Sequence, residues 1–171
     1  MHTFKRREIL PLEANLLWQI HSGAVRLLTL SENGTPITLG FWGGGDLTGQ
    51  PLICIEPGEI ECLTKVQAVP LDPKQCWNFQ QVMRSHLQQM QELIQLRQGQ
   101  IPQRLSMLLH WLSLKFGHPV EQGCLIQLRL THQDMADTIG TTRVTVTRLM
   151  QELERNGQIG YSKKNCVILP E

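Results

Sequence analysis

The sequence predicts an α+β protein in which a small N-terminal antiparallel β-roll, one long helix and a helix-rich C-terminal segment follow one another. Short apolar runs separated by turn signals fill the first third of the chain, and helical periodicity replaces them from about Pro73. In the last part, helices closed by glycine precede a predicted hairpin. We expect three parts with the boundaries 1–73, 74–99 and 100–171.

The composition is that of an ordinary globular protein. The chain has 171 residues, 41% of them hydrophobic, so it can bury a core in one domain or in two small ones. No apolar run reaches the roughly 20 residues that cross a bilayer, and the basic start MHTFKRREIL leads into Pro11 and Glu13 rather than into a signal core. Five scattered cysteines without a CxxC pair favour buried thiols over a disulfide framework. We therefore expect a cytoplasmic protein without membrane contact.

The N-terminal segment predicts strands of about four to seven residues. The runs LWQI, AVRLLTL, PITLGFW and LTKVQAV alternate with the turn signals HSG, SENG, GGGD and EPGE. Asn33-Gly34, between two of these runs, is typical of a β-hairpin because both residues accept a positive φ. Repeated strands and turns of this kind favour a small antiparallel barrel or roll.

The segment from about Pro73 to Gln98 predicts one long helix. Four apolar residues spaced by 4, 3 and 4 positions share one face, namely Met83, Leu87, Met90 and Ile94. A second apolar edge consists of Val82, Leu93 and Leu96. This surface exceeds what one small roll needs, which favours a two-stranded coiled-coil contact in a homodimer over packing against the protein's own roll. Arg97 interrupts the stripe, and Gly99 with Pro102 ends the helix, so that 98–102 is a predicted hinge.

The C-terminal part has the element order of a winged helix-turn-helix. RLSMLLHWLSLKFG predicts an amphipathic helix ending at Gly117, and CLIQLRL predicts a strand. THQDMADTIG predicts a short helix that begins after the N-cap Thr131 and ends at Gly140. A second helix follows over Thr141–Gly157, and GQIGYSKKNCVIL predicts a two-stranded ribbon around Lys163 and Lys164.

The stretch TTRVTVTRLMQELERNG has a composition that a buried or ordinary surface helix does not need. Its β-branched residues lose rotamer freedom in a helix, and its two arginines lie about 140° apart around the axis. If the helix enters a major groove, Arg143 and Arg148 suit guanine edges and Val144 suits a thymine methyl. The hydroxyls of Thr142 and Thr145 suit phosphates.

The rest of this helix predicts an anchor to the protein. Leu149, Leu153 and Ile159 are expected to pack against three partners, Met135, Ile139 and Leu108. Basic residues outnumber acidic ones over 143–164, although the whole chain has a net charge of only +1. On charge alone, a solvated helix surface is favoured over a nucleic-acid partner as the reason for this excess.

With these residues in view, the chain resembles the CRP/FNR family of bacterial transcription regulators over nearly its full length. The segments that carry the resemblance are LWQIHSGAVRL, ITLGFWGGGDLTGQ, QRLSMLLHWL and LTHQDMADTIGTTRVTVTRLMQELERNG. The TRVTVTRL core is most similar to the cyanobacterial nitrogen regulators of that family.

The resemblance implies a homodimer that reads a palindromic site of the form GTA-N8-TAC in double-stranded DNA, with RNA polymerase as a further partner. By position, it implies base contacts from Arg143, Val144 and Arg148. It implies contacts to the DNA backbone from Thr131, His132, Gln133, Thr142, Thr145 and the wing residues Lys163 and Lys164.

The predicted roll departs from the members of the family that bind cyclic AMP. Their Gly-Glu pair is replaced by Gly49-Gln50, and Cys62-Leu63 stands where they have Arg-Ser or Arg-Thr. A buried phosphate without that arginine lacks its charge partner, and the nearby Glu59 and Glu61 repel it. We therefore expect a regulator that works without cyclic AMP.

No cofactor is predicted, and the effector is open. Only REILPLEAN stands where the family has a fuller first hairpin, which predicts a shortened roll. The N-terminal cysteine cluster of the iron–sulfur branch is missing, whereas heme or redox roles stay open for Cys62, Cys76 and His86.

An alternative hypothesis is a ligand- or redox-sensing adaptor that acts through protein contacts rather than DNA. Enzymatic motifs such as GxSxG or HExxH are missing from the sequence, so we expect no catalytic activity. The choice between activator and repressor, and the target genes, stay open at this point.

Overall fold

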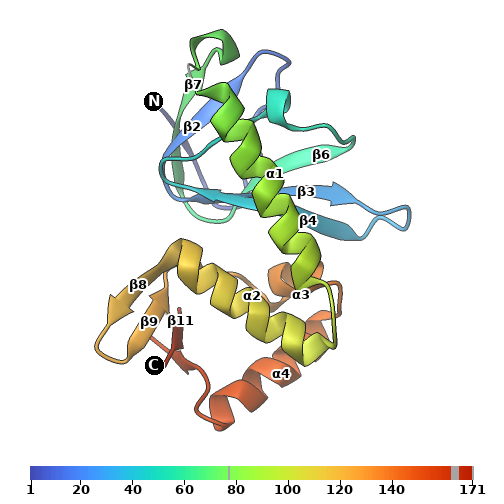
Figure 1. Ribbon diagram of the computed structural model, residues 1–171, viewed down its shortest axis with the longest axis vertical. Coiled ribbons are helices and arrows are strands. Elements are labelled where there is room, and N and C mark those ends of the chain that lie inside the picture. The colour runs from blue at the N-terminus through green and yellow to red at the C-terminus, as the bar shows by residue number, and fades with distance from the viewer. Residues whose placement is uncertain (77, 163–165, 171) are drawn as a thin grey trace. The chain divides into compact units, whose positions relative to one another are not determined.

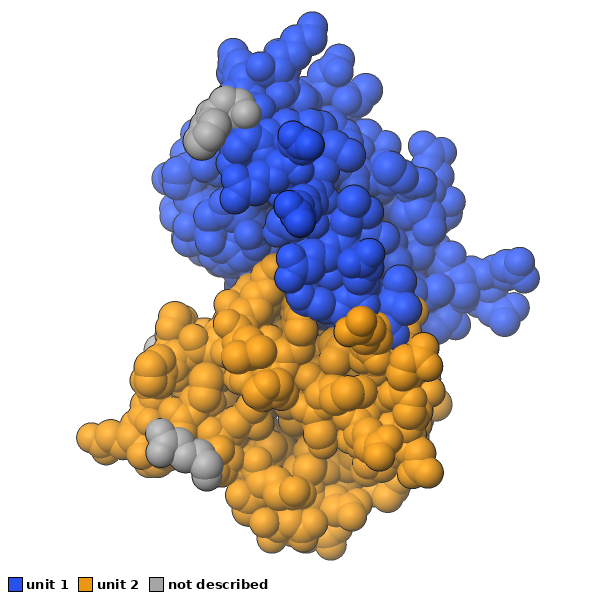
Figure 2. Space-filling view, viewed as in Figure 1, with its two compact units in different colours: residues 1–94 blue, residues 95–171 orange. Residues whose placement is uncertain are grey.

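The computed structural model describes residues 1–76, 78–162 and 166–170. The chain divides into two compact units, residues 1–94 and 95–171, which are described separately (Figure 2). In the described parts of the chain, no helix is long and apolar enough to span a membrane. The predicted functional boundaries at residues 73 and 99 remain predictions.

Unit 1 consists of two antiparallel sheets and a long helix (Figure 1). The first sheet has the strand order β1 (His2–Phe4), β7 (Val66–Leu71), β2 (Leu17–Ser22) and β5 (Leu47–Gly49). The second has the order β4 (Pro36–Gly43), β3 (Ala24–Leu30) and β6 (Gly58–Cys62). Both sheets contribute to one core, which includes Trp18, Ile20, Val25, Leu27, Trp42, Ile60, Val66 and Ala68. The expected β-roll is therefore confirmed.

Three of the four predicted strands correspond to β2, β3 and β4, whereas the fourth begins later than expected. LTKVQAV was predicted to be extended from Leu63, but β7 starts at Val66. The preceding residues form a bend, because Leu63 N donates to Ala24 O at 2.8 Å and Ala24 N donates to the Thr64 hydroxyl at 2.9 Å. This bend joins β7 to β6, a strand that the sequence analysis missed together with β1 and β5.

The Asn33-Gly34 signal correctly predicts the β3–β4 hairpin, although the loop is longer than a two-residue turn. Ser31 N donates to Thr35 O and Gly34 N donates to Ser31 O, both at 2.9 Å. Gly34 has a φ of +73°, and Asn33 does not share this left-handed conformation. Only the glycine therefore supplies the positive φ that closes the loop.

Helix α1 (Phe79–Leu96) begins six residues later than predicted. Asp72 accepts a hydrogen bond from Lys74 N at 2.8 Å and starts a short 3₁₀ turn over Pro73–Gln75, which ends before α1 begins. One face of α1 is tied to the roll of unit 1: His86 Nε2 lies 2.8 Å from Leu47 O, and Gln89 Oε1 accepts a bond from Phe41 N.

The described residues of unit 2 form three helices and a four-stranded antiparallel sheet (Figure 1). The helices are α2 (Ile101–Phe116), α3 (His132–Ile139) and α4 (Arg143–Arg155). The sheet has the order β10 (Gly160–Tyr161), β11 (Val167–Leu169), β9 (Gly123–Ile126) and β8 (Gly117–Val120). The winged helix-turn-helix order predicted from the sequence is confirmed. Lys163, Lys164 and Asn165, the predicted tip of the ribbon, lie outside the described residues.

Two details of unit 2 correct the sequence analysis. CLIQLRL is a strand only as far as Ile126, because β11 pairs with Cys124 and Leu125 and the chain then leaves the sheet to reach the N-cap of α3. The strand β8 was not predicted; it pairs with β9 directly after α2. The predicted break between the helices is confirmed at Gly99, which has a φ of +83° and lies between Leu96, the end of α1, and the start of α2. Pro102 lies outside the break, because it occupies the first turn of α2, where proline is tolerated.

Candidate nucleic-acid interface

Helix α3 starts at a reciprocal capping box. The Thr131 hydroxyl accepts from Asp134 N at 3.1 Å, and the Asp134 carboxylate accepts from Thr131 N at 2.8 Å. These bonds satisfy backbone donors that a helix start otherwise leaves unpaired, and a cap of this kind contributes about 1 kcal/mol. Thr131 itself is exposed, so its side chain lies at the surface while it fixes the helix start.

The turn between α3 and α4 depends on Gly140. This residue has a φ of 73° and a ψ of 55°, the left-handed conformation that glycine adopts without steric cost. Both Gly140 N and Thr141 N donate to Ala136 O, at 2.9 and 3.0 Å. A Cβ at position 140 would meet only an Arg104 nitrogen at 3.9 Å, so the backbone conformation, and not a lack of space, accounts for the glycine.

Two arginines hold the C-terminal carbonyl groups of α3. Arg97 donates to Thr138 O at 2.9 Å and to Asp137 O at 3.3 Å, and Arg104 donates to Ile139 O at 3.2 Å. Cations stabilise this end of a helix because they complement its partial negative charge. Burial, and then the neighbouring Arg104, lower the pKa of Arg97. In the sequence, Arg97 is recognisable only as an interruption of an apolar stripe, so its contact with the end of α3 was not predicted.

Helix α4 begins at Arg143, two residues later than predicted. Thr142 is its N-cap: its hydroxyl accepts from Thr145 N at 3.2 Å and lies 2.9 Å from the Thr145 hydroxyl. As a result, Arg143 and Val144 occupy the first turn of the helix. Of the two threonine hydroxyls predicted to bind DNA phosphates, that of Thr142 therefore also caps the helix, and one of the two hydroxyls donates a hydrogen bond to the other.

The two faces of α4 differ sharply in exposure. Its inner face holds Val146, Leu149 and Met150, which are buried. Of the six residues of the expected anchor, five are buried and Leu153 is half-buried; the buried ones are Leu108, Met135, Ile139, Leu149 and Ile159. Which of them pack against each other stays a prediction. The opposite face exposes Arg143, Arg148 and Val144, and the valine is 77% exposed. Val144 is therefore free of packing within its own unit, as a residue of the predicted DNA-facing surface must be.

Arg148, a predicted base-reading residue, has a partner within its own helix. Its guanidinium lies 3.7 Å from the Glu152 carboxylate, one helical turn further on, and both side chains are more than half exposed. Exposed pairs at this spacing contribute about 0.3–0.5 kcal/mol, which a DNA contact can readily replace. Gln133 is also exposed, and its amide donates to the Asp137 carboxylate at 2.7 Å.

A hydrogen-bond chain connects α3 with α4 at this surface. His132 Nδ1 lies 2.8 Å from the Thr147 hydroxyl, which in turn lies 2.9 Å from Arg143 O. Burial, and then the nearby Arg143, lower the pKa of His132. Thr147 was not among the predicted site residues, and its place one turn after Arg143 was the signal that could have identified it.

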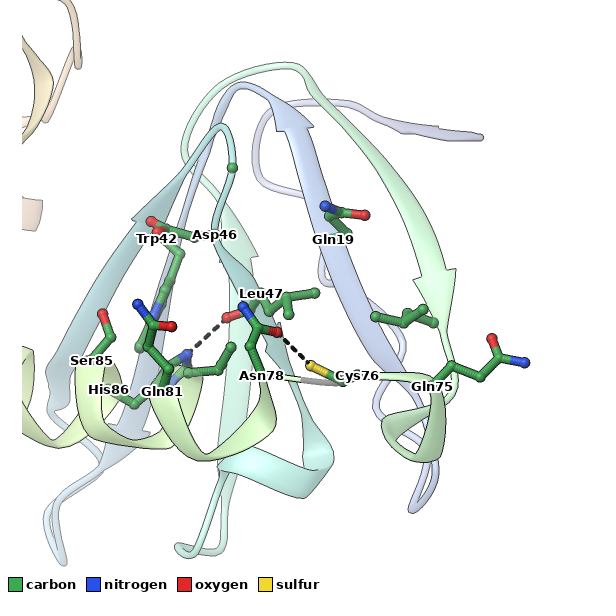
Figure 3. Close-up of a pocket in the computed structure, with 13 residues that line it drawn as sticks. Gln19, Trp42, Asp46, Leu47, Gln75, Cys76, Asn78, Gln81, Ser85 and His86 are labelled. Atoms are coloured by element: carbon green, nitrogen blue, oxygen red, sulfur yellow. Dashed lines mark hydrogen bonds between the residues drawn. The ribbon is translucent and has the colours of Figure 1, made fainter.

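A second candidate site lies in unit 1, where Cys76 and His86 line a cavity of about 500 Å³ (Figure 3). The His86 ring stacks on Trp42 with centroids 4.5 Å apart, and the Cys76 thiol donates to Asn78 Oδ1 at 3.2 Å. Cys62, the third heme or redox candidate, lies elsewhere, in the core of the roll. Burial, followed by Glu8 and Glu61, raises its pKa to about 12, so its thiol stays protonated at neutral pH.

The arrangement of α3, its tight turn, the exposed α4 and the following β-ribbon defines a winged helix-turn-helix, a class of DNA-binding domain. A family model described as a Crp-like helix-turn-helix domain matches residues 103–171. The chain is 41% identical over 168 residues to the regulatory protein CysR of Synechococcus elongatus, covering 95% of this chain and 81% of that protein. It is 29% identical over 174 residues to the global nitrogen regulator of the same organism, covering 91% of this chain and 78% of that protein.

The chain therefore belongs to the CRP/FNR family of transcription regulators, and it is related to the cyanobacterial nitrogen regulators within that family. A CRP-family transcriptional regulator from Thermus thermophilus shares its fold with a TM-score of 0.83 at 23% identity, over 100% of this chain and 92% of the other. A CRP/FNR-family regulator from the same organism has a TM-score of 0.75 at 25% identity, covering 99% and 93% of the two chains.

Proposed function

We propose that the protein is a homodimer that reads a palindromic GTA-N8-TAC-like site in double-stranded DNA and does so without cyclic AMP. The observation that carries the proposal is the exposed face of α4. Arg143, Val144 and Arg148 project from a helix whose other face is buried and whose ends are fixed by hydrogen bonds. Arginine suits guanine, and valine suits the methyl group of thymine.

The backbone of DNA is the second element of this proposal. Thr131, Thr142 and Gln133 are exposed at the starts of α3 and α4, where side chains reach phosphates beside a major groove. We place His132 and Thr145 in the same group; the wing residues Lys163 and Lys164 belong to it as a prediction from the sequence. These contacts fix the register of the helix and carry no base preference.

The dimer contact is proposed to involve α1. Met83, Leu87 and Ile94 are 45%, 58% and 61% exposed, and Met90 is half-buried. They form a stripe at helical spacing on a helix whose other face is tied to the roll, which suits a two-stranded helical contact. Such a dimer places two α4 helices about 34 Å apart, one turn of DNA. On this view, residues 1–73 regulate, 74–99 dimerise and 100–171 bind DNA and, at a promoter, lie beside RNA polymerase.

The absence of a cyclic AMP requirement is supported by the interior of the roll. Cys62 and Leu63 are both buried, so the position expected for a phosphate-binding arginine is occupied by apolar packing. Glu61 accepts from Arg26 at 2.7 Å and from Arg7 at 2.9 Å, and these ion pairs engage two of the cations of the roll. A buried phosphate would find little charge compensation at these residues.

Fluorescence anisotropy on a GTA-N8-TAC duplex tests the proposal, with a scrambled duplex beside it, across a salt series and without added ligand. We expect tighter binding to the palindrome and a linear loss of log affinity with log salt concentration. Equal binding to both duplexes, followed by failure of a random-duplex selection to enrich a palindrome, would contradict the proposed reading of DNA.

The cavity beside Cys76 and His86 favours the adaptor alternative as a second function. A cavity of about 500 Å³ with several polar side chains is the size of a small-molecule site. Protein association that depends on a ligand, together with DNA binding that does not respond to salt, would support the adaptor over the DNA-binding regulator.

A further inference from the structure

The Thr147 hydroxyl fixes where the proton of His132 sits. Thr147 Oγ1 lies 2.9 Å from Arg143 O, and a carbonyl oxygen can only accept, so the single hydroxyl proton points to that carbonyl. His132 Nδ1 lies 2.8 Å from the same Oγ1. Because the hydroxyl proton is already used, Nδ1 must carry a hydrogen and donate it. The geometry therefore assigns the Nδ1–H tautomer to the neutral imidazole.

This tautomer leaves the other ring nitrogen, Nε2, with a lone pair and no hydrogen. Within the described parts of the chain, no hydrogen bond involves His132 Nε2, and the half-buried side chain is open to solvent in part. A lone pair on Nε2 cannot bind a phosphate, because phosphate oxygens are acceptors as well. The proposed backbone contact of His132 thus needs a second proton on the ring.

We propose that His132 contacts a DNA phosphate only as the imidazolium, so that each protomer takes up one proton from solvent when it binds DNA. The inference rests on the proposed function and specifies how one of its phosphate contacts forms. The proton is added at Nε2 and no bond in the protein breaks. In the complex, Nδ1–H still donates to Thr147, and Nε2–H donates to a phosphate oxygen in a charge-assisted bond.

The charges around the ring oppose protonation before DNA arrives. Arg143 on α4 is the charged group whose field acts on His132, and it lowers the pKa of the ring after the larger effect of burial. On α3 itself, the Asp134 carboxylate is bonded to Thr131 N, and Gln133 is uncharged. A phosphate brings a negative charge to both Arg143 and the ring, which raises the pKa of His132 in the complex.

Proton uptake by His132 makes DNA affinity depend on pH. The free protein has a His132 pKa below the usual 6.5, and the complex has a higher one. Between these two values, DNA affinity falls as pH rises, by up to about tenfold per pH unit for each proton taken up. A dimer can take up two protons, one in each protomer. Below the pKa of the free protein the ring is protonated in both states, and the dependence disappears.

The test measures the affinity for the GTA-N8-TAC duplex from pH 5.5 to 8.5 at constant ionic strength, with titration calorimetry in two buffers of different ionisation enthalpy. We expect affinity to fall with pH and the calorimetric heats to report up to two protons per dimer. His132→Asn retains a donor near the Nδ1 position for Thr147 but has no group at Nε2, so it should lose the pH dependence. His132→Gln places an amide N–H near the Nε2 position and should bind with an affinity independent of pH.

His110→Gln is the matched control, since His110 is an exposed histidine on α2 and its removal should leave the proton count unchanged. Specific binding by the wild type without proton uptake overturns this inference and leaves the proposed function intact. The same proton uptake in His132→Asn also overturns it. Failure to bind any duplex contradicts the proposed function and the inference together. NMR titration of the His132 ring in the free and bound protein provides a second readout, with a higher pKa expected in the complex.

Discussion

The two units use their polar side chains in different ways. In unit 1, His86 lines the cavity and its ring hydrogen-bonds with Leu47 O, while Gln89, further along α1, accepts a hydrogen bond from Phe41 N. In unit 2, Arg97 and Arg104 bond to the end of α3, while Arg143 projects from the first turn of α4. In unit 2, therefore, Arg97 and Arg104 hold backbone carbonyl groups, whereas Arg143 is exposed at the surface. Under the proposed function, recognition comes from outward-facing side chains on a backbone that hydrogen bonds hold in place.

The largest expected effect comes from Leu87→Glu in unit 1, far along the sequence from the predicted DNA contacts. Leu87 is 58% exposed, so the substitution leaves the fold of the subunit intact while it places like charges across the proposed dimer contact. A monomer reaches only one half-site at a time and loses the gain from linked binding, which is about 10²- to 10⁴-fold. Analytical ultracentrifugation measures the loss of the dimer, and fluorescence anisotropy measures the loss of DNA affinity.

Gln88→Glu is the control for Leu87→Glu, because it adds the same charge at an exposed neighbouring position of α1 outside the apolar stripe. Gln88→Glu also replaces the hydrogen bond from Gln88 to Glu92 with a like-charge pair, at a cost of about 0.2–0.5 kcal/mol to the helix. This cost is too small to change the oligomeric state or to lower DNA affinity by more than a small factor. A Leu87→Glu protein that remains a dimer with unchanged affinity would place the dimer contact elsewhere, and the assignment of α1 would then be wrong.

A smaller effect is expected from Arg143→Ala, which acts on the exposed set of unit 2 alone. Loss of a bidentate guanine contact costs about 1–3 kcal/mol for the palindrome, with little loss for random DNA. Arg155→Ala, at the other end of the same helix, removes an equal charge and should weaken both duplexes slightly and equally. Anisotropy on both duplexes separates the two outcomes. Equal losses for Arg143→Ala on both duplexes would show a phosphate contact in place of base reading.

The sequence predicts features well where the signal is local. Thr131 and Gly140 mark the two ends of α3 because a cap and a left-handed glycine leave direct traces in the sequence. The hairpin at Gly34 and the buried stripe of α4 were also predicted from local sequence patterns. The marked ends of α3 and the buried stripe of α4 are enough to predict the winged helix-turn-helix, whereas the face of α4 that meets DNA stays a prediction.

Most of the missed features depend on partners distant in the sequence, whereas strand β8 pairs with the adjacent β9. Strand β6 contains Glu61, a residue type that strands disfavour, and its partner Arg26 lies 35 positions away. The arginine contacts to the end of α3 join residues 35 to 41 positions apart. The His132–Thr147 bond depends on the angle between two helices, which periodicity does not contain. Local sequence patterns therefore predict the helices and turns, whereas the hydrogen bonds that support them can be identified only once the three-dimensional fold is known.

The smallest expected effect concerns the support of the reading face. Gly140→Ala places a Cβ in a left-handed conformation, which costs about 1–2 kcal/mol for an L-residue. Because a Cβ there meets only an Arg104 nitrogen at 3.9 Å, the whole cost comes from the backbone. Urea unfolding measures this cost as a decrease in the free energy of unfolding. Gly160→Ala is the control, since Gly160 has open space around its Cβ position and no positive φ.

Gly140→Ala also tests whether the turn between α3 and α4 affects DNA binding as well as stability. Every exposed side chain of α4 is unchanged, so a loss of DNA affinity that accompanies the loss of stability would show that the angle between α3 and α4 is part of the recognition. Unchanged affinity in the folded population would mean that the strained turn still holds this angle, and that the glycine contributes stability alone. A Gly140→Ala protein as stable as Gly160→Ala would show that the turn has changed its conformation to avoid the strain.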